Sequence, residues 1–169
     1  DMYSVMARVC IGMTNDEMAQ EYFQRAVRLL EGTDDVREMS RLSTIYGEYM
    51  SFYINRNRMA EAIEIGYRRE TVIQRMSGLP GPPPGYIDQQ YGFLYAKMAV
   101  LLHDEGKKEE ATEIFRKYQS TSFSKTLIGK QYSVPYLLNI NQYAEAAALS
   151  DTCISAFTND TVSLSLIHI

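Results

Sequence analysis

The chain has 169 residues, with 17 basic and 21 acidic side chains and a formal net charge of −4. Proteins that bind nucleic acid gather Lys and Arg into a patch that neutralises phosphates. The basic residues here are scattered and outnumbered by carboxylates, so we expect no nucleic-acid binding by this segment. Its longest uncharged apolar run is far shorter than the roughly 20 residues of a membrane-spanning helix, which predicts no membrane insertion.

The residue types that most enzymes use for catalysis are scarce. The only histidines are His103 and His168, and the sequence has no phosphate-binding glycine loop, zinc-protease motif or nucleophile elbow. Cys10 and Cys153 lie far apart and in no CxxC or Cys/His pattern, which indicates neither a disulfide framework nor a zinc site. We therefore expect a chain that is not an enzyme and that has no cofactor and no metal.

Apolar residues recur in steps of three and four along most of the chain, which places them on one face of successive helices. This spacing predicts eight helices, at residues 2–13, 16–31, 35–55, 58–77, 88–104, 107–119, 126–139 and 142–156. Thr14 with Glu17, and Asp35 with Glu38, have the spacing of a capping box at the start of the second and third helices. No alternating apolar segment indicates a strand. The sequence predicts an all-α protein.

Four helix starts share one pattern, in which an alanine follows a Thr, Asn or Gly by five residues. The pairs are Thr14 and Ala19, Asn57 and Ala62, Gly106 and Ala111, and Asn141 and Ala146. The first residue of each pair suits a helix end or an N-cap, and the alanine lets two antiparallel helices approach closely. Each unit is therefore a helical hairpin that buries its apolar face by stacking on the next.

The apolar pattern of residues 3–26 recurs 92 residues later, from Tyr95 to Tyr118. In these residues the chain resembles the tetratricopeptide-repeat family. The resemblance covers nearly the whole chain and implies an all-α, right-handed superhelix of about four helical hairpins, or about eight helices. The second copy departs from the family at Gly66 and Arg69, which replace a large and a small apolar residue, and the last copy is poor in its first helix. The four alanines are 43, 49 and 35 residues apart, against about 34 in the family, so we expect an irregular solenoid.

The segment from Gly78 to Gly85 holds four of the five prolines and interrupts the helices. Proline lacks an amide donor and fixes its backbone, which favours a polyproline II excursion there. We interpret residues 78–87 as a rigid connector inside a single solenoid that spans residues 1–160. The same loop is a candidate for recognition by an aromatic groove.

Both ends of the chain look incomplete or foreign. The chain begins with Asp1, and Tyr3 is already a core-type residue, so we expect further residues upstream and an exposed stacking face on the first hairpin. The segment from Leu164 to the C-terminus has no turn signal, charge or helical period. Residues 161–169 are accordingly predicted to form a disordered or non-native tail.

Tyrosine is frequent, with 13 residues and no tryptophan. Many of them cluster in two helices, at Tyr46, Tyr49, Tyr53, Tyr86, Tyr91 and Tyr95. One hypothesis is an aromatic lining for a sugar or a peptide. The other, which the spacing of three and four favours, is packing within and between hairpins.

In stacked hairpins the first helices of successive units line the concave surface, where polar residues beside the core stripe are free to contact a partner. These candidate partner-binding residues are Arg8, Ser51, Asn55, Lys97 and His103. They are mostly polar and nearly uncharged in sum. We therefore expect a protein or peptide partner, bound with modest salt dependence.

The string from Gly78 to Tyr91, together with Pro135 to Leu138, resembles the repeat-containing sensory region of bacterial signal-transduction proteins. There an exported helical-repeat region precedes a membrane helix and a histidine kinase or helix-turn-helix output domain. The resemblance implies a non-catalytic module for sensing or partner recognition, located in the periplasm, in a longer protein that can carry a kinase domain. Two alternatives stay open: a cytoplasmic scaffold or adaptor, and a surface glycan-binding lipoprotein.

Overall fold

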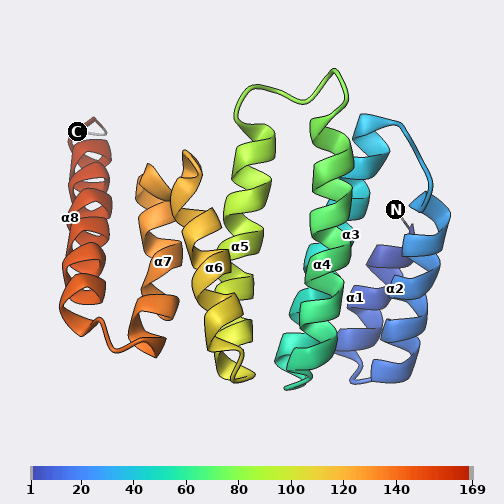
Figure 1. Ribbon diagram of the computed structural model, residues 1–169. Helices are drawn as coiled ribbons and strands as arrows, with labels where there is room; N and C mark the ends of the chain where they lie inside the picture. The colour runs from blue at the N-terminus through green and yellow to red at the C-terminus, as the bar shows by residue number, and fades with distance from the viewer. Residues whose placement is uncertain (1, 168–169) are drawn as a thin grey trace. The chain divides into compact units, whose positions relative to one another are not determined.

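The computed structural model describes the backbone of residues 2–167 and the side chains of residues 2–156, and this part of the chain is helical without strands (Figure 1). The elements are α1 (Met2–Gly12), α2 (Asp16–Leu30), α3 (Val36–Asn55), α4 (Met59–Ser77), α5 (Tyr86–Asp104), α6 (Lys108–Ser120), the 3-10 turn η1 (Phe123–Lys125), α7 (Leu127–Asn139) and α8 (Tyr143–Ile167). The predicted all-α class is confirmed, and each predicted helix begins within two residues of an observed one.

The chain forms two compact units, residues 1–94 and 95–169. The first unit contains α1 to α4 and the first part of α5, and the second contains the remainder of α5 and the elements that follow. The boundary falls inside α5 and not at the predicted connector, residues 78–87. Each unit is described by itself, and the single solenoid over residues 1–160 stays a prediction.

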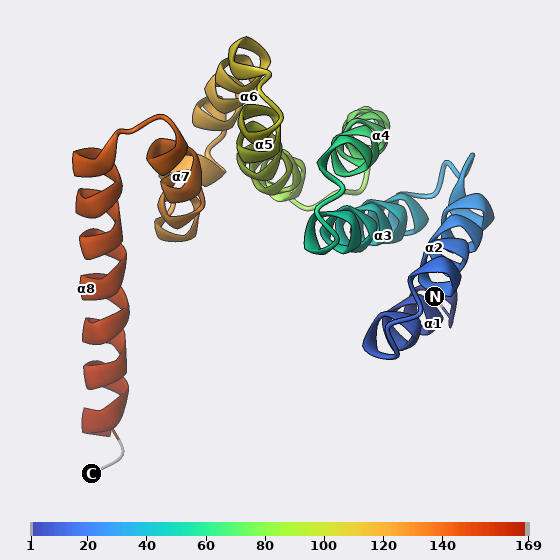
Figure 2. The same ribbon diagram turned by 90° about the horizontal axis from the view of Figure 1, so that it is seen from below.

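Within each unit, helices that follow one another in the chain pack as hairpins (Figure 2). In the first unit α1 packs on α2, α2 on α3, and α3 on α4; in the second, α7 packs on α8, and η1 packs on α6 and α7. Polar pairs join the hairpins of the first unit. Arg56, after α3, donates two hydrogen bonds of 2.6 and 2.7 Å to the carboxylate of Asp16, at the start of α2. These bonds lower the pKa of the Asp16 carboxyl.

The four repeated turns share one backbone conformation. Thr14, Asn57, Gly106 and Asn141 have left-handed φ values of 57°, 56°, 79° and 62°. In each case the amide of the next residue donates to a carbonyl five residues before it: Asn15 to Cys10, Arg58 to Tyr53, Lys107 to Leu102 and Gln142 to Leu137, with N···O distances of 2.9, 2.9, 2.8 and 2.9 Å. This is the bond that closes a helix in the Schellman motif. The first residue of each predicted pair is therefore a helix end.

The alanine of each pair lies in the closest part of its hairpin. Ala19, Ala62 and Ala111 are fully buried, and Ala146 is 2% exposed. Each alanine amide donates to the carbonyl four residues before it, so the alanine stands in the first turn of the second helix. A larger side chain there would force the two helices apart.

The predicted capping box at Thr14 and Glu17 is wrong by one residue. The N-cap of α2 is Asn15, whose side chain accepts a hydrogen bond of 3.1 Å from the amide of Met18. Thr14 cannot cap α2, because its left-handed backbone is occupied with ending α1. At α3 the prediction is confirmed for Asp35, which accepts hydrogen bonds from the amides of Arg37 and Glu38.

The proline-rich segment is free of helix, as predicted. Helix α4 ends at Ser77 and α5 begins at Tyr86, and Gly81 and Gly85 take φ values of 119° and 77°. The segment lies inside the first unit.

The turn η1, absent from the sequence prediction, shapes the second unit. Helix α7 approaches it so closely that a Cβ atom on Gly129 would lie 1.9 Å from the carbonyl oxygen of Phe123. On the other side, the buried hydroxyl of Tyr118 donates to the carbonyl of Gly129. Burial raises the pKa of Tyr118 to about 12, so this hydroxyl keeps its proton.

Helix α8 continues to Ile167, beyond its predicted end at residue 156. Residues 157–167 contain no Gly or Pro, so no local signal ends the helix. The predicted tail, residues 161–169, overlaps this last part of α8, and residues 168 and 169 lie outside the described residues. The non-native origin of the tail stays a prediction.

Thr14 is a β-branched residue in a left-handed conformation, which costs about 1–2 kcal/mol for a residue with a Cβ atom. We expect Thr14→Gly to raise the free energy of unfolding by roughly 1 kcal/mol, after allowing for the greater flexibility of Gly in the unfolded chain. The reverse change at the equivalent turn, Gly106→Thr, should lower it. Urea titrations followed by circular dichroism would contradict this turn if both variants moved the same way.

We expect Gly129→Ala to destabilise the second unit by roughly 1–3 kcal/mol, because the new methyl group meets the backbone of η1, which has little room to yield. Gly12→Ala is the matched control, since no atom lies within 4 Å of the Cβ position there. Thermal unfolding of both variants checks this expectation, and an unchanged midpoint for Gly129→Ala would show that α7 does not approach η1.

Candidate functional site

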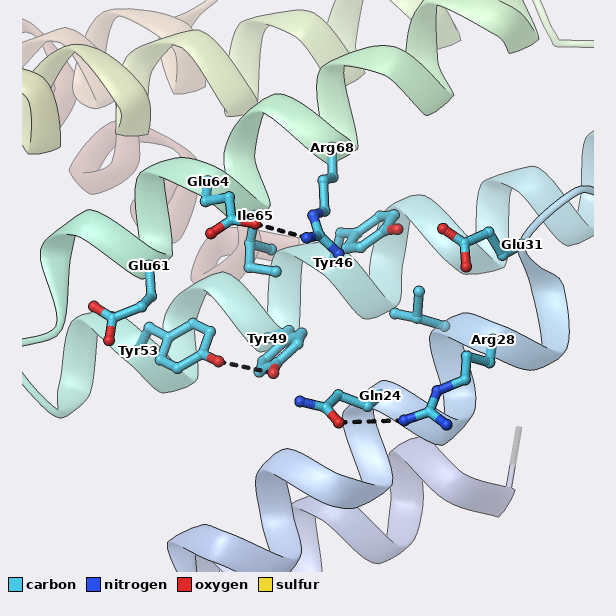
Figure 3. Close-up of a pocket in the computed structure, with 11 residues that line it drawn as sticks. Gln24, Arg28, Glu31, Tyr46, Tyr49, Tyr53, Glu61, Glu64, Ile65 and Arg68 are labelled. Carbon is cyan, nitrogen blue, oxygen red and sulfur yellow. Dashed lines mark hydrogen bonds and ion pairs between the residues drawn. The ribbon is translucent and has the colours of Figure 1, made fainter.

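The first unit contains a hollow of about 470 Å³ between α2, α3 and α4, which we call the tyrosine groove (Figure 3). It is lined by Gln24, Val27, Arg28, Glu31, Tyr46, Tyr49, Tyr53, Glu61, Glu64, Ile65 and Arg68. The tyrosines come from α3, and the charged side chains come from α2 and α4 on either side. The groove thus has an aromatic floor and a charged rim.

The floor is rigid because its rings pack against one another. Tyr49 and Tyr53 are stacked with ring centroids 4.7 Å apart, and their hydroxyls share a hydrogen bond of 2.8 Å. Phe23 of α2 stacks on the other face of this cluster, with its centroid 4.8 Å from that of Tyr49. Tyr46, Tyr49 and Tyr53 are only 3%, 4% and 5% exposed. They offer little open ring surface on which a sugar could stack.

The rim carries both signs of charge, partly neutralised by local pairs. Arg68 and Glu64 form an ion pair of 2.6 Å along α4, and Arg28 donates a hydrogen bond of 3.4 Å to Gln24 along α2 (Figure 3). Glu61 pairs with Arg58 at 2.7 Å. These pairs are solvent-exposed, so each adds little to stability and remains available to a ligand.

The phenols of Tyr46 and Tyr53 stay protonated over the ordinary pH range. Burial, followed by the nearby Glu31 carboxylate, raises the pKa of Tyr46. Burial and the hydrogen bond with Tyr49 raise the pKa of Tyr53. The groove can therefore donate and accept hydrogen bonds through neutral hydroxyls, whereas proton transfer near neutral pH would require a group of lower pKa.

The candidate residues chosen from the sequence lie outside the tyrosine groove and belong to both units. In the first unit, Arg8 of α1 pairs with Glu48 of α3 at 3.2 Å. Ser51 follows on α3 and donates to the carbonyl of Gly47, and Asn55 is exposed one turn further along. Arg8, Ser51 and Asn55 thus lie on α1 and α3, around Glu48.

The other two candidates, Lys97 and His103, belong to the second unit. His103 is half-buried near the end of α5, with its ring edge-on to Tyr136 of α7 and the centroids 6.2 Å apart. Asp104 lies 3.9 Å from its Nδ1 atom. His103 is therefore less exposed than a typical surface residue. Its packing on Tyr136 could not be predicted from the residues next to it in the sequence.

Two further surfaces are notable. Helix α1 and the residue after it expose a set of apolar side chains, namely Met2, Val5, Met6, Val9 and Met13. A hollow of about 640 Å³ lies along the proline-rich segment and is lined by prolines together with Ile87 and Tyr91. The hollow does not test the role of this loop in recognition, which stays a prediction.

Within the described residues, no group of three or more His, Cys, Asp or Glu side chains is placed to hold a metal ion. Cys10 and Cys153 are buried free thiols. No helix in the described part combines the length and apolar character needed to cross a membrane. Comparison of the chain with protein-family models, curated proteins and solved structures gives no match.

The sequence indicated the floor of the groove but not its rim. Tyr46, Tyr49 and Tyr53 stood out by their spacing, and the favoured packing role agrees with their burial. They also border the hollow, and their role as a lining for a ligand stays a prediction. No local sequence signal marks the rim residues. Arg28 and Arg68 line the same hollow only because α2 and α4 lie on either side of α3.

We expect Tyr53→Phe to lower the free energy of unfolding by roughly 0.5–1.5 kcal/mol, the net value of one hydrogen bond, because the hydroxyl of Tyr49 loses its partner. Tyr22→Phe is a suitable control, since the hydroxyl of Tyr22 has no hydrogen bond among the described residues. Urea midpoints measure both effects, and equal midpoints for the two variants would contradict the hydroxyl pair.

Proposed function

We propose that the chain is a non-catalytic helical-repeat module that binds a protein or peptide partner. The observation that carries this proposal is the tyrosine groove, with its rigid aromatic floor and its rim of both charges. A polar and charged rim around an aromatic centre is typical of peptide and protein interfaces, and here the rim offers the exposed groups, because the tyrosine rings are buried.

The balanced charge of the groove favours a short segment of a partner over a strongly charged small molecule. Its volume of about 470 Å³ is in the range of ordinary ligand pockets. Each side of the opening carries both signs of charge, with Arg28 and Glu31 on the side of α2 and with Arg68, Glu61 and Glu64 on α4 (Figure 3). Since these charges nearly cancel, the groove suits a peptide of mixed charge, bound with modest salt dependence.

The finer assignment is the sensory or partner-recognition region of a bacterial signal-transduction protein, built of tetratricopeptide-like repeats. Four hairpin turns with the same left-handed residue and the same buried alanine support repeats of this kind. The role in signalling is supported only by the resemblance of residues 78–91 and 135–138. A cytoplasmic scaffold would have the same fold and groove, whereas a glycan-binding protein is less well supported, because the tyrosine rings are buried.

The groove can be tested without knowing its natural partner. Peptides selected from a random phage library on the full chain provide ligands, whose affinities are then measured by calorimetry. We expect the double variant Gln24→Ala/Arg28→Ala, on the rim, to weaken the selected peptides by about tenfold or more, the loss typical of residues that matter at an interface.

The matched control is Arg8→Ala/Asn55→Ala, which removes an equivalent pair of polar side chains from α1 and α3. Loss of affinity in the rim variant alone supports the tyrosine groove. Loss in the control alone would move the site to the surface around Glu48 that the sequence indicated. Failure to select any peptide would contradict the proposed function.

A further inference from the structure

Arg69 lies on α4 at a place where the repeat pattern has a small apolar residue, and its guanidinium is largely buried between α3, α4 and α5. Its Nε donates a hydrogen bond of 3.2 Å to the hydroxyl of Ser43, and its Nη2 donates one of 3.0 Å to the side-chain oxygen of Gln90. Both acceptors are neutral. The charge of Arg69 is therefore held by dipoles and not by an acid.

This environment sets Arg69 apart from other arginines of the unit. Carboxylates lie within 3.2 Å of six of them: Arg8, Arg25, Arg56, Arg58, Arg68 and Arg75. No carboxylate among the described residues pairs with Arg69, although its guanidinium is more deeply buried than those of the six paired arginines. Burial lowers the pKa of its guanidinium. A buried cation without a counter-charge is costly unless an anion accompanies it.

The remaining donors of Arg69 form a fork. A guanidinium has five N–H groups, and the two hydrogen bonds use one on Nε and one on Nη2. Two on Nη1 and one on Nη2 are left. A carboxylate accepts from one hydrogen on each of these nitrogens in the bidentate pairing that arginine favours. Among the described side chains, Nη1 is not a buried atom that lacks a hydrogen-bond partner, so it retains contact with solvent.

The surroundings of this fork are small and polar. The guanidinium packs against Gly47 of α3, where a Cβ atom would lie only 3.0 Å from Nη1. The hydroxyls of Ser40 and Tyr86 form a second polar pair between α3 and α5. Ser40, Ser43, Arg69, Tyr86 and Gln90 together make a cradle, named here the Arg69 cradle, whose only formal charge is that of Arg69.

We propose that the Arg69 cradle is a binding site for a carboxylate group of a ligand, held bidentately by Nη1 and Nη2. The carboxylate belongs to an acidic side chain or to the C-terminus of a bound peptide, since both present the same planar pair of oxygens. The cradle shares no residue with the tyrosine groove. Its role as a carboxylate site therefore does not depend on the function proposed for the groove.

The full chain is titrated with sodium acetate against sodium chloride at constant ionic strength, and the Nε–H signals of the arginines are followed by nuclear magnetic resonance. We expect the Arg69 signal to shift and saturate with acetate. The signal of Arg25 serves as an internal control, because its guanidinium already holds the carboxylate of Glu21 and lies outside the tyrosine groove. N-acetylalanine and the amide of N-acetylglutamate then compare a chain terminus with an acidic side chain.

Variants test whether the fork is responsible. Arg69→Lys keeps the charge but loses the planar fork, and we expect it to weaken acetate binding by about tenfold or more, measured on the neighbouring backbone amides. Arg25→Gln, outside both the cradle and the tyrosine groove, should leave acetate binding unchanged. Circular dichroism checks that each variant is folded. An Arg69 signal that ignores acetate, an equal response to chloride, or a response to phosphate without one to acetate would overturn the proposal.

Discussion

The reversal of the chain at a left-handed residue is the constraint on which the rest of the structure depends. At Thr14, Asn57, Gly106 and Asn141 the turn ends one helix and fixes where the next begins. An alanine five residues later then lets the second helix lie close to the first. Because only a methyl group lies between the two helices at this point, the larger residues further along can interlock.

The candidate sites are consequences of this hairpin geometry in the first unit. Helix α3 packs on both α2 and α4, so the tyrosines on one of its faces become the floor of a groove between two other helices. Ser43 and Gly47, on the same helix, lie against Arg69 of α4. One helix thus contributes to an aromatic groove of balanced charge and to a polar cradle with an uncompensated positive charge, and the two call for ligands of different chemistry.

The features that the sequence predicted correctly are those with local signals. Helix positions follow from apolar spacing, and the turns follow from Asn or Gly five residues before an alanine. Thr14 shows the limit of such signals, because a threonine before a helix is an ordinary N-cap, and only its left-handed backbone shows that Asn15 takes this role. The turn η1 was missed because it depends on contact between Phe123 and Gly129, which no periodicity reveals. Arg69 was noticed as a departure from the repeat, but its neutral neighbours on α3 and α5 are 21 and more residues away in sequence.

Amide hydrogen exchange tests the repeated turn most directly. The amides of Asn15, Arg58, Lys107 and Gln142 each donate the hydrogen bond that closes a helix, although each follows the end of that helix. We predict that all four exchange slowly, with protection approaching that of the buried alanine amides four residues later. Exchange as fast as that of open loop amides at these positions would contradict the shared turn, and with it the hairpin geometry that positions the groove and the cradle.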